Sequence, residues 1–203
     1  MTGAAAVCLY LLVLAFPEPL FAYSLARENF RVYSRHAIDP GVGEILDEVN
    51  RRLSRSEINV AALTHRVFIL DTPAWNSFFN GPYRAAMGRN CEIGNAVFIP
   101  RLDVQGGRVV HFDGRSAEAA SILAHECAHT LVQRRLGLIR MWRLPFWKKE
   151  GYAEYIGMDE ARSEPEPMPY RRARLRWKFL LEKEGLTFDQ VMQSRAVPGQ
   201  HLN

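Results

Sequence analysis

The segment from Ala117 to Leu136 restricts the fold of this chain more than any other. It contains no proline or glycine, Ser116 can cap its start, and Gly137 can end it. Within it lies the sequence His125-Glu126-Cys127-Ala128-His129. Histidines four residues apart on a helix point the same way, so they can bind one metal ion. The segment therefore predicts a helix with a metal site near its middle.

The two histidines share a helical stripe with apolar side chains. A polar ring in such a stripe costs free energy unless it has a partner, and one metal ion satisfies both rings. The alternative is a chance match, or two ordinary core histidines. The stripe consists of Ile122, His125, His129, Val132 and Leu136.

A second segment offers a third ligand. A catalytic zinc ion usually has three protein ligands and one open position. Glu150 opens Glu150-Gly151-Tyr152-Ala153-Glu154, on a helix predicted over residues 146–156. Glu154 lies one turn later and can accept a hydrogen bond from the other nitrogen of a ligating histidine, or be an ordinary surface glutamate. Glu126 is placed to take a proton from a metal-bound water. The pattern predicts one Zn²⁺ per chain.

These two motifs resemble the gluzincin (peptidase MA-like) branch of the zinc metallopeptidases. The resemblance covers about residues 96–157 and implies a zincin-like fold, bound zinc, Glu150 as the third ligand and hydrolysis of peptide bonds. Twenty residues separate His129 from Glu150, somewhat more than in the aminopeptidase-type members. No glycine and histidine follow His129 at the spacing typical of the metzincin branch.

The resemblance also implies where a substrate binds. In that group the strand before the metal helix pairs with the substrate, which gives this role to Arg108–Phe112. The contact residues are then Val109, Val110 and His111. A hydrogen-bond donor should stabilise the oxyanion that forms during the reaction. The alternative role of each tyrosine is packing in the core or at an interface. The candidate donors are Tyr152, Tyr155, Tyr170 and His201.

The sequence predicts a zinc-dependent peptidase with a zinc-activated water and Glu126 as general base. The alternatives are a catalytically inactive zincin-like module that binds or regulates at the membrane, and a basic membrane-surface adaptor with a structural zinc. An intact ligand and base set argues against the inactive module. A structural zinc needs four protein ligands, and no fourth histidine or cysteine is suitably placed.

Composition is that of an ordinary globular protein with one sizeable core. The chain has 203 residues, of which 48% are hydrophobic and 24% charged. No nucleic-acid motif accompanies the net charge of +4, so the expected partner is a peptide or protein substrate. Part of the basic charge forms a solvated helix face or meets an anionic membrane surface. These residues are Arg171, Arg172, Arg174, Arg176 and Lys178.

Three cysteines are present and none forms a Cys-x-x-Cys pair, which excludes a cysteine zinc site. Cys8 lies in the N-terminal apolar segment. A Cys91–Cys127 bridge stays open, although a small buried residue is the expected role of Cys127.

The N-terminus begins with an apolar run. Ala4 to Phe16 is an unbroken stretch of thirteen apolar residues, which Pro17-Glu18-Pro19 interrupts. This length is typical of a signal-peptide core, and residues 1–23 are predicted to be a signal peptide or membrane anchor, with a buried helix as the alternative. Arg27, Arg31 and Arg35 follow and argue against export, so the orientation of an exported or membrane-anchored chain is left open.

Periodicity predicts an α+β fold with a small, mostly N-terminal sheet packed on helices. Residues 24–203 are expected to form one domain, zincin-like as the resemblance implies, with a helical C-terminal part from about 165 to 203. No strand is expected after residue 112, residues 80–95 are expected to form a loop, and residues 164–169 a linker. Strands are predicted at 30–34, 65–70, 96–100 and 108–112, the last two as a hairpin, and helices at 40–54, from 73, 117–136, 146–156, 170–184 and 187–192.

Overall fold

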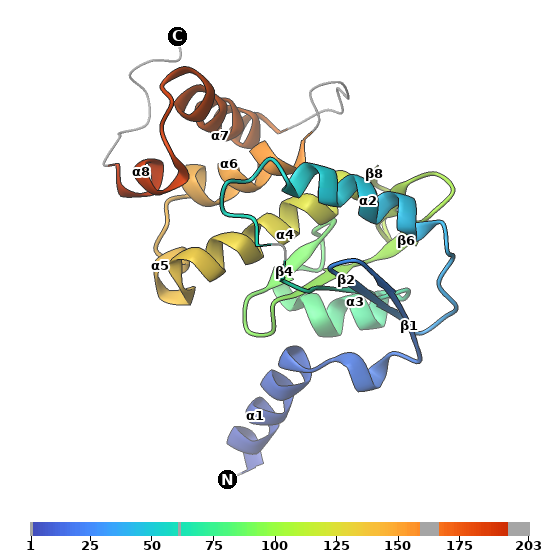
Figure 1. Cartoon of the computed structure of the whole chain (residues 1–203). Coiled ribbons are helices and arrows are strands. Elements are labelled where there is room, and N and C mark those ends of the chain that lie inside the picture. Colours follow the sequence, from blue (N-terminus) through green and yellow to red (C-terminus); the bar gives the residue numbers. More distant parts are fainter. Residues whose placement is uncertain (1, 61, 159–166, 195–203) are drawn as a thin grey trace.

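The computed structural model of the chain describes residues 2–60, 62–158 and 167–194 (Figure 1). This part is α+β, as predicted, with a five-stranded mixed sheet and a three-stranded antiparallel sheet. Its helices are α1 (Thr2–Ala15), α2 (Val42–Leu53), α3 (Pro73–Asn80), α4 (Ala119–Leu136), α5 (Leu138–Trp142), α6 (Phe146–Gly157), α7 (Met168–Lys178) and α8 (Phe188–Gln193). Shorter helical turns are η1 (Glu18–Leu20), η2 (Gly81–Tyr83) and the π-helical η3 (Phe179–Lys183).

The five-stranded sheet has the order β1-β2-β3-β5-β4. The three central strands run parallel, and the two edge strands are antiparallel to their neighbours. Parallel neighbours need a crossover connection, which α2 and α3 supply. The strands are β1 (Tyr23–Arg27), β2 (Phe30–Ser34), β3 (His65–Ile69), β4 (Arg89–Cys91) and β5 (Ala96–Ile99).

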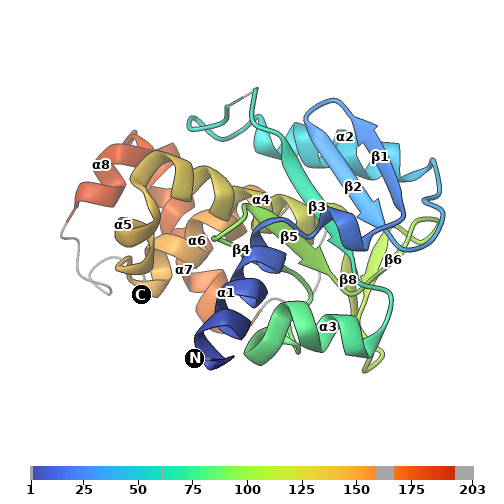
Figure 2. The ribbon, with the colours of Figure 1, turned by 90° about the horizontal axis from the view of Figure 1, so that it is seen from below.

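The two faces of this sheet bury different side chains. Val67 and Val97 pack in the larger core, with buried residues of α2 and α4. The next residues, Phe68 and Phe98, point to the other face, where their rings contact each other and Phe98 stacks on Phe79 of α3. Figure 2 shows α3 beside α1, which also contributes to this second cluster. The predicted metal helix, α4, therefore lies against the first face.

Most predicted elements are present. The strands predicted at 30–34, 65–70 and 96–100 are β2, β3 and β5, each within one residue. Thr72 caps α3 by accepting a hydrogen bond from the Trp75 N–H, and Thr187 caps α8. The helix predicted over 40–54 is α2, and its apolar positions are all buried: Val42, Ile45, Leu46, Val49 and Leu53.

The predicted hairpin between 96–100 and 108–112 is wrong. β7 (Arg108–Val110) pairs instead with β6 (Arg101–Asp103) and with β8 (Ser116–Glu118). β5 is buried along its whole length, so it belongs inside the larger sheet, whereas β6 is largely exposed. Strand content also continues beyond residue 112, and Ser116 lies in β8 rather than capping α4, which begins after Glu118.

Other elements lack a clear local signal in the sequence. β4 forms inside the expected loop 80–95 because it pairs with β5, and β1 begins within the expected N-terminal segment. α5 follows directly after Gly137, which ends α4 in a left-handed conformation with φ 81°. The helix predicted from residue 170 starts at Met168, and residues 164–166 of the expected linker lie outside the described chain.

Cys91 and Cys127 are buried free thiols, so no bridge joins them. Burial raises the pKa of both thiols.

Among the described helices, none combines the length and apolar character needed to cross a membrane.

Candidate metal centre

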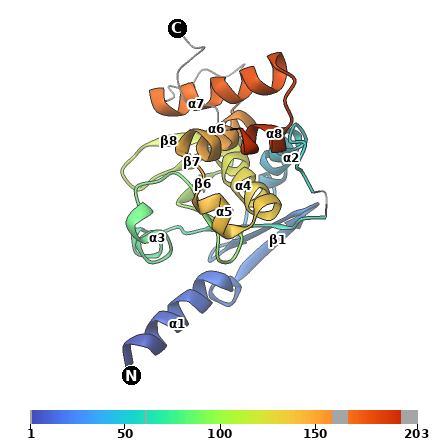
Figure 3. The same cartoon turned by 90° about the vertical axis from the view of Figure 1, so that its left-hand side faces the viewer.

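Two helices bring the site together. Figure 3 shows α7 above α6, and α6 above α4. The helices approach closely at two glycines of α6. A Cβ on Gly157 would lie 3.0 Å from the Ser121 carbonyl oxygen and 3.1 Å from the His125 Cβ. A Cβ on Gly151 would lie 2.8 Å from the backbone of Ala173 in α7. The absence of side chains at these positions therefore sets the distance between α6 and its neighbours.

The three predicted ligands converge. The His125 and His129 Nε2 atoms lie 3.2 Å apart, and each lies 3.4 Å from the Glu150 Oε2 atom. Ligand atoms bound at about 2.0–2.1 Å around one tetrahedral zinc ion lie roughly 3.3–3.4 Å from each other. The two nitrogens and the oxygen are therefore spaced like three corners of a tetrahedral zinc site, and zinc binding itself stays a prediction.

Glu154 also lies where it was expected. Its Oε2 atom is 2.8 Å from the His125 Nδ1 atom, the nitrogen that faces away from the ligand group. A hydrogen bond from Nδ1 to this carboxylate leaves Nε2 with a free lone pair to bind a metal ion. The His129 Nδ1 atom is buried and has no hydrogen-bond partner among the described residues.

The carboxylates of Glu150 and Glu154 stabilise a positive charge at His125. Burial alone would lower the pKa of His125, but hydrogen bonds to Glu150 and Glu154 outweigh it and raise the pKa to about 10. The histidines in turn hold the pKa of Glu150 far below its usual range, although burial acts in the opposite direction. A cation can therefore replace the proton of His125 at low electrostatic cost.

Glu126 lies under the edge strand β4. Its Oε2 atom accepts a hydrogen bond of 2.6 Å from the Asn90 backbone N–H. The Asn90 side chain also donates to the Thr130 hydroxyl over 2.6 Å, so β4 is bonded to α4 twice. A Cβ on Gly88 would lie 3.0 Å from the Glu126 Cγ and 2.7 Å from the Ile122 Cγ2. The strand can approach the proposed base this closely because residue 88 has no side chain.

The predicted substrate strand is wrong. Val109 and Val110 belong to β7, which is the middle strand of its sheet and is paired on both sides. No free edge is left there for a peptide. His111 is buried, and its Nε2 atom lies 2.8 Å from the Arg84 carbonyl oxygen. The edge strand next to Glu126 is β4, whose three residues show no alternation that could have predicted it.

The structure separates the tyrosine candidates. Tyr152 is buried, its hydroxyl lies 2.7 Å from the Ser56 hydroxyl, and it packs against Trp177, so it is a core residue. The Tyr155 hydroxyl donates to Glu182 over 3.3 Å. Burial and the charges of Glu150, Glu154 and Glu126 raise the pKa of Tyr170, whose ring meets that of Phe146 edge to face. His201 lies outside the described residues.

The basic residues of α7 do not form one uniform surface. Arg171 and Arg172 are exposed, whereas the guanidinium of Arg176 lies over the Trp147 ring, 4.0 Å from its centroid. Part of the predicted charge is therefore used to pack α7 against α6.

Comparison of the chain with protein-family models, with curated proteins and with solved structures finds no match in any of the three.

Proposed function

We propose that this chain is a zinc-dependent peptidase with a zincin-like arrangement of its metal helices. The observation that carries the proposal is the convergence of His125, His129 and Glu150, whose ligand atoms lie within 4.8 Å of one another, with Glu126 next to His125 in α4. A zinc ion bound there supplies a Lewis acid that polarises a carbonyl and lowers the pKa of its water.

Each nearby residue has a distinct task in this proposal. Glu126 takes a proton from the attacking water and passes it to the leaving amine, while the Asn90 N–H holds its carboxylate in place. Glu154 orients the His125 ring through Nδ1. Tyr170, with its protonated hydroxyl, is the remaining tyrosine candidate for stabilising the oxyanion.

The test compares Glu126→Gln with wild type on two readouts, zinc content and cleavage of a proteome-derived peptide library. We expect one zinc per chain in both proteins, and a loss of cleavage of about 10²–10⁴-fold in the variant. Glu44→Gln is the matched control, because Glu44 is exposed on α2.

Three results would contradict the proposal. Wild type without bound zinc would show that the site does not hold this metal. Bound zinc with equal cleavage by wild type and Glu126→Gln would show that Glu126 is not the base. Bound zinc with no cleavage by either protein would favour the inactive binding or regulatory module.

A further inference from the structure

The N-terminal helix α1 projects from the body of the protein (Figures 1 and 3). Its sequence from Thr2 to Ala15 contains no charged residue. Large apolar side chains on and just after it are 40–63% exposed: Val7, Leu9, Leu11, Leu12 and Phe16. At 100° per residue Val7, Leu9, Leu11 and Leu12 spread over about 200° of the helix surface, and Tyr10, Val13 and Leu14, which face the body, occupy the rest. A protein groove covers one stripe of a helix, whereas a helix that is apolar all round needs a surrounding apolar medium.

The C-terminal end of α1 is fixed to the body. Leu14 and Phe21 are only 4% and 8% exposed, and they belong to the aromatic cluster beneath the sheet. A Cβ on Gly94 would lie 2.9 Å from the carbonyl oxygens of both Leu14 and Ala15. Arg66 donates to the Ala15 carbonyl over 3.0 Å and also bonds to Glu18 and to the Gly94 carbonyl. The helix therefore sits directly on the β4–β5 turn.

Aromatic and basic residues surround the place where α1 leaves the body. The Tyr10 hydroxyl donates to the Phe78 carbonyl over 2.8 Å, and the two rings meet edge to face. Trp75 contacts Phe78, and the Arg35 guanidinium lies 5.1 Å from the centroid of the Trp75 ring. Trp, Tyr and Arg side chains are typical of the headgroup level of a bilayer, where the cation also meets anionic lipids.

We propose that α1 is retained in the working protein and enters the hydrocarbon layer of a lipid bilayer, with Tyr10, Trp75, Phe78 and Arg35 at the headgroups. Removal of residues 1–23 would take Leu14 and Phe21 out of the core. The end of α1 contacts Gly94 in the β4–β5 turn, and Asn90 of β4 bonds to Glu126. Insertion of α1 into a bilayer would therefore fix the orientation of the candidate metal centre relative to the membrane.

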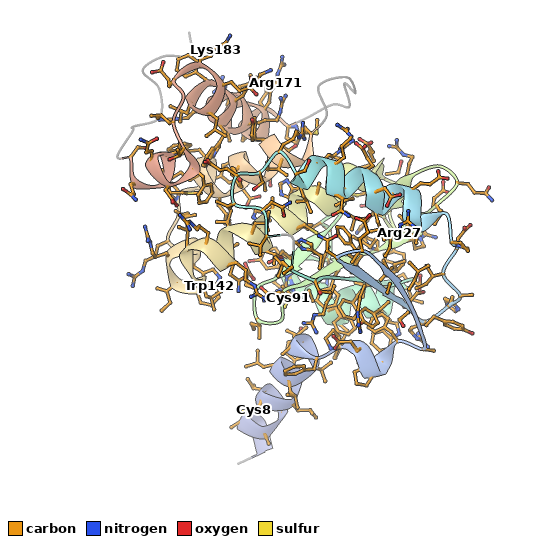
Figure 4. All side chains as sticks on the ribbon, viewed as in Figure 1. Cys8, Arg27, Cys91, Trp142, Arg171 and Lys183 are labelled. Atoms are coloured by element: carbon orange, nitrogen blue, oxygen red, sulfur yellow. The ribbon has the colours of Figure 1, made fainter. Side chains whose placement is uncertain are left out.

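The chain contains its own probe for this proposal. Cys8 lies exposed on α1, whereas Cys91 and Cys127 are buried, so an environment-sensitive dye will label Cys8 selectively (Figure 4). We expect a blue shift of the dye when phosphatidylcholine vesicles are added to the full chain, and quenching by lipids with a nitroxide on the acyl chain. Vesicles that also contain phosphatidylglycerol should bind more tightly because of Arg35.

Unlabelled variants test the same contact by vesicle flotation. The double variant Leu9→Asn and Leu12→Asn should bind at least about tenfold more weakly, since both side chains are exposed on α1. Ile139→Asn is the control, because Ile139 is 65% exposed on α5. An unshifted Cys8 dye in wild type would overturn the proposal, and so would equal weakening by the control and the double variant.

Discussion

Arg52 of α2 donates from Nη1 to the carbonyl oxygen of Gly157, the last residue of α6, over 2.6 Å. Its Nη2 atom donates to Glu118, the residue before α4, over 2.8 Å. Arg52 is only 1% exposed. One buried guanidinium thus joins the end of α6 to the start of α4, the two helices that carry the candidate ligands.

Arg52→Met should destabilise the fold strongly. It leaves the buried carboxylate of Glu118 and the Gly157 carbonyl without this partner, which costs about 3–5 kcal/mol of unfolding free energy. Urea denaturation measures the loss. Arg27→Met is the control, because Arg27 pairs with Asp47 on the surface, and its effect should be much smaller. Equal losses of unfolding free energy in the two variants would show that the buried contacts of Arg52 stabilise the fold no more than a surface ion pair does.

His65 should make stability depend on pH. The ring is buried beside Phe30, neither nitrogen has a hydrogen-bond partner among the described residues, and burial with the charge of Arg134 lowers its pKa to about 4. The unfolded chain has the ordinary pKa of about 6.5 and binds more protons between these values. The unfolding free energy is therefore unaffected by His65 protonation above pH 6.5. It falls by up to about 3 kcal/mol as the pH drops to 4.

His65→Phe isolates this contribution, because phenylalanine keeps an aromatic ring against Phe30 and cannot bind a proton. The difference in unfolding free energy between the variant and wild type should change between pH 7 and pH 4.5, in favour of the variant at the lower value. His36→Asn, at an exposed position, is the control. A difference that stays constant with pH would exclude His65 as the titrating group.

Local patterns predicted that His125, His129 and Glu150 come together, whereas elements that depend on tertiary pairing could not be predicted from the sequence. His125 and His129 share a face because the helical period fixes it, and Glu150 and Glu154 lie one turn apart on α6 for the same reason. The position of β4 depends on pairing with β5, which Arg89-Asn90-Cys91 alone does not indicate. The sequence does not show that β6 and β8 lie on either side of Val109, so it predicts a substrate-binding edge where the structure has a middle strand. Tyr152 lies next to Gly151 in the motif, yet its side chain points into the core.

Glu154→Gln should weaken metal binding without removing a ligand. It replaces the carboxylate that accepts from the His125 Nδ1 atom by a neutral amide, and such outer contacts are typically worth about 10–100-fold in metal affinity. Competition with a chromophoric chelator measures the dissociation constant for zinc. Glu182→Gln is the matched control, because Glu182 bonds to Tyr155 outside the ligand group. Unchanged affinity in Glu154→Gln would mean that this contact does not tune the site.

Two glycines, Gly43 in α2 and Gly157 at the end of α6, should respond in opposite ways to replacement by alanine. A methyl group on Gly43 of α2 meets only ordinary contacts, the nearest at 3.8 Å, so Gly43→Ala should stabilise the fold by up to about 1 kcal/mol through helix propensity. A methyl group on Gly157 would lie 3.0 Å from the Ser121 carbonyl oxygen and 3.2 Å from the His125 backbone nitrogen. Because those atoms belong to α4, α6 must move away, which should cost about 1–3 kcal/mol and weaken zinc binding. Urea denaturation and the chelator assay measure both effects. Gly157→Ala with the zinc affinity of wild type would show that the spacing of α4 and α6 does not control the ligand geometry.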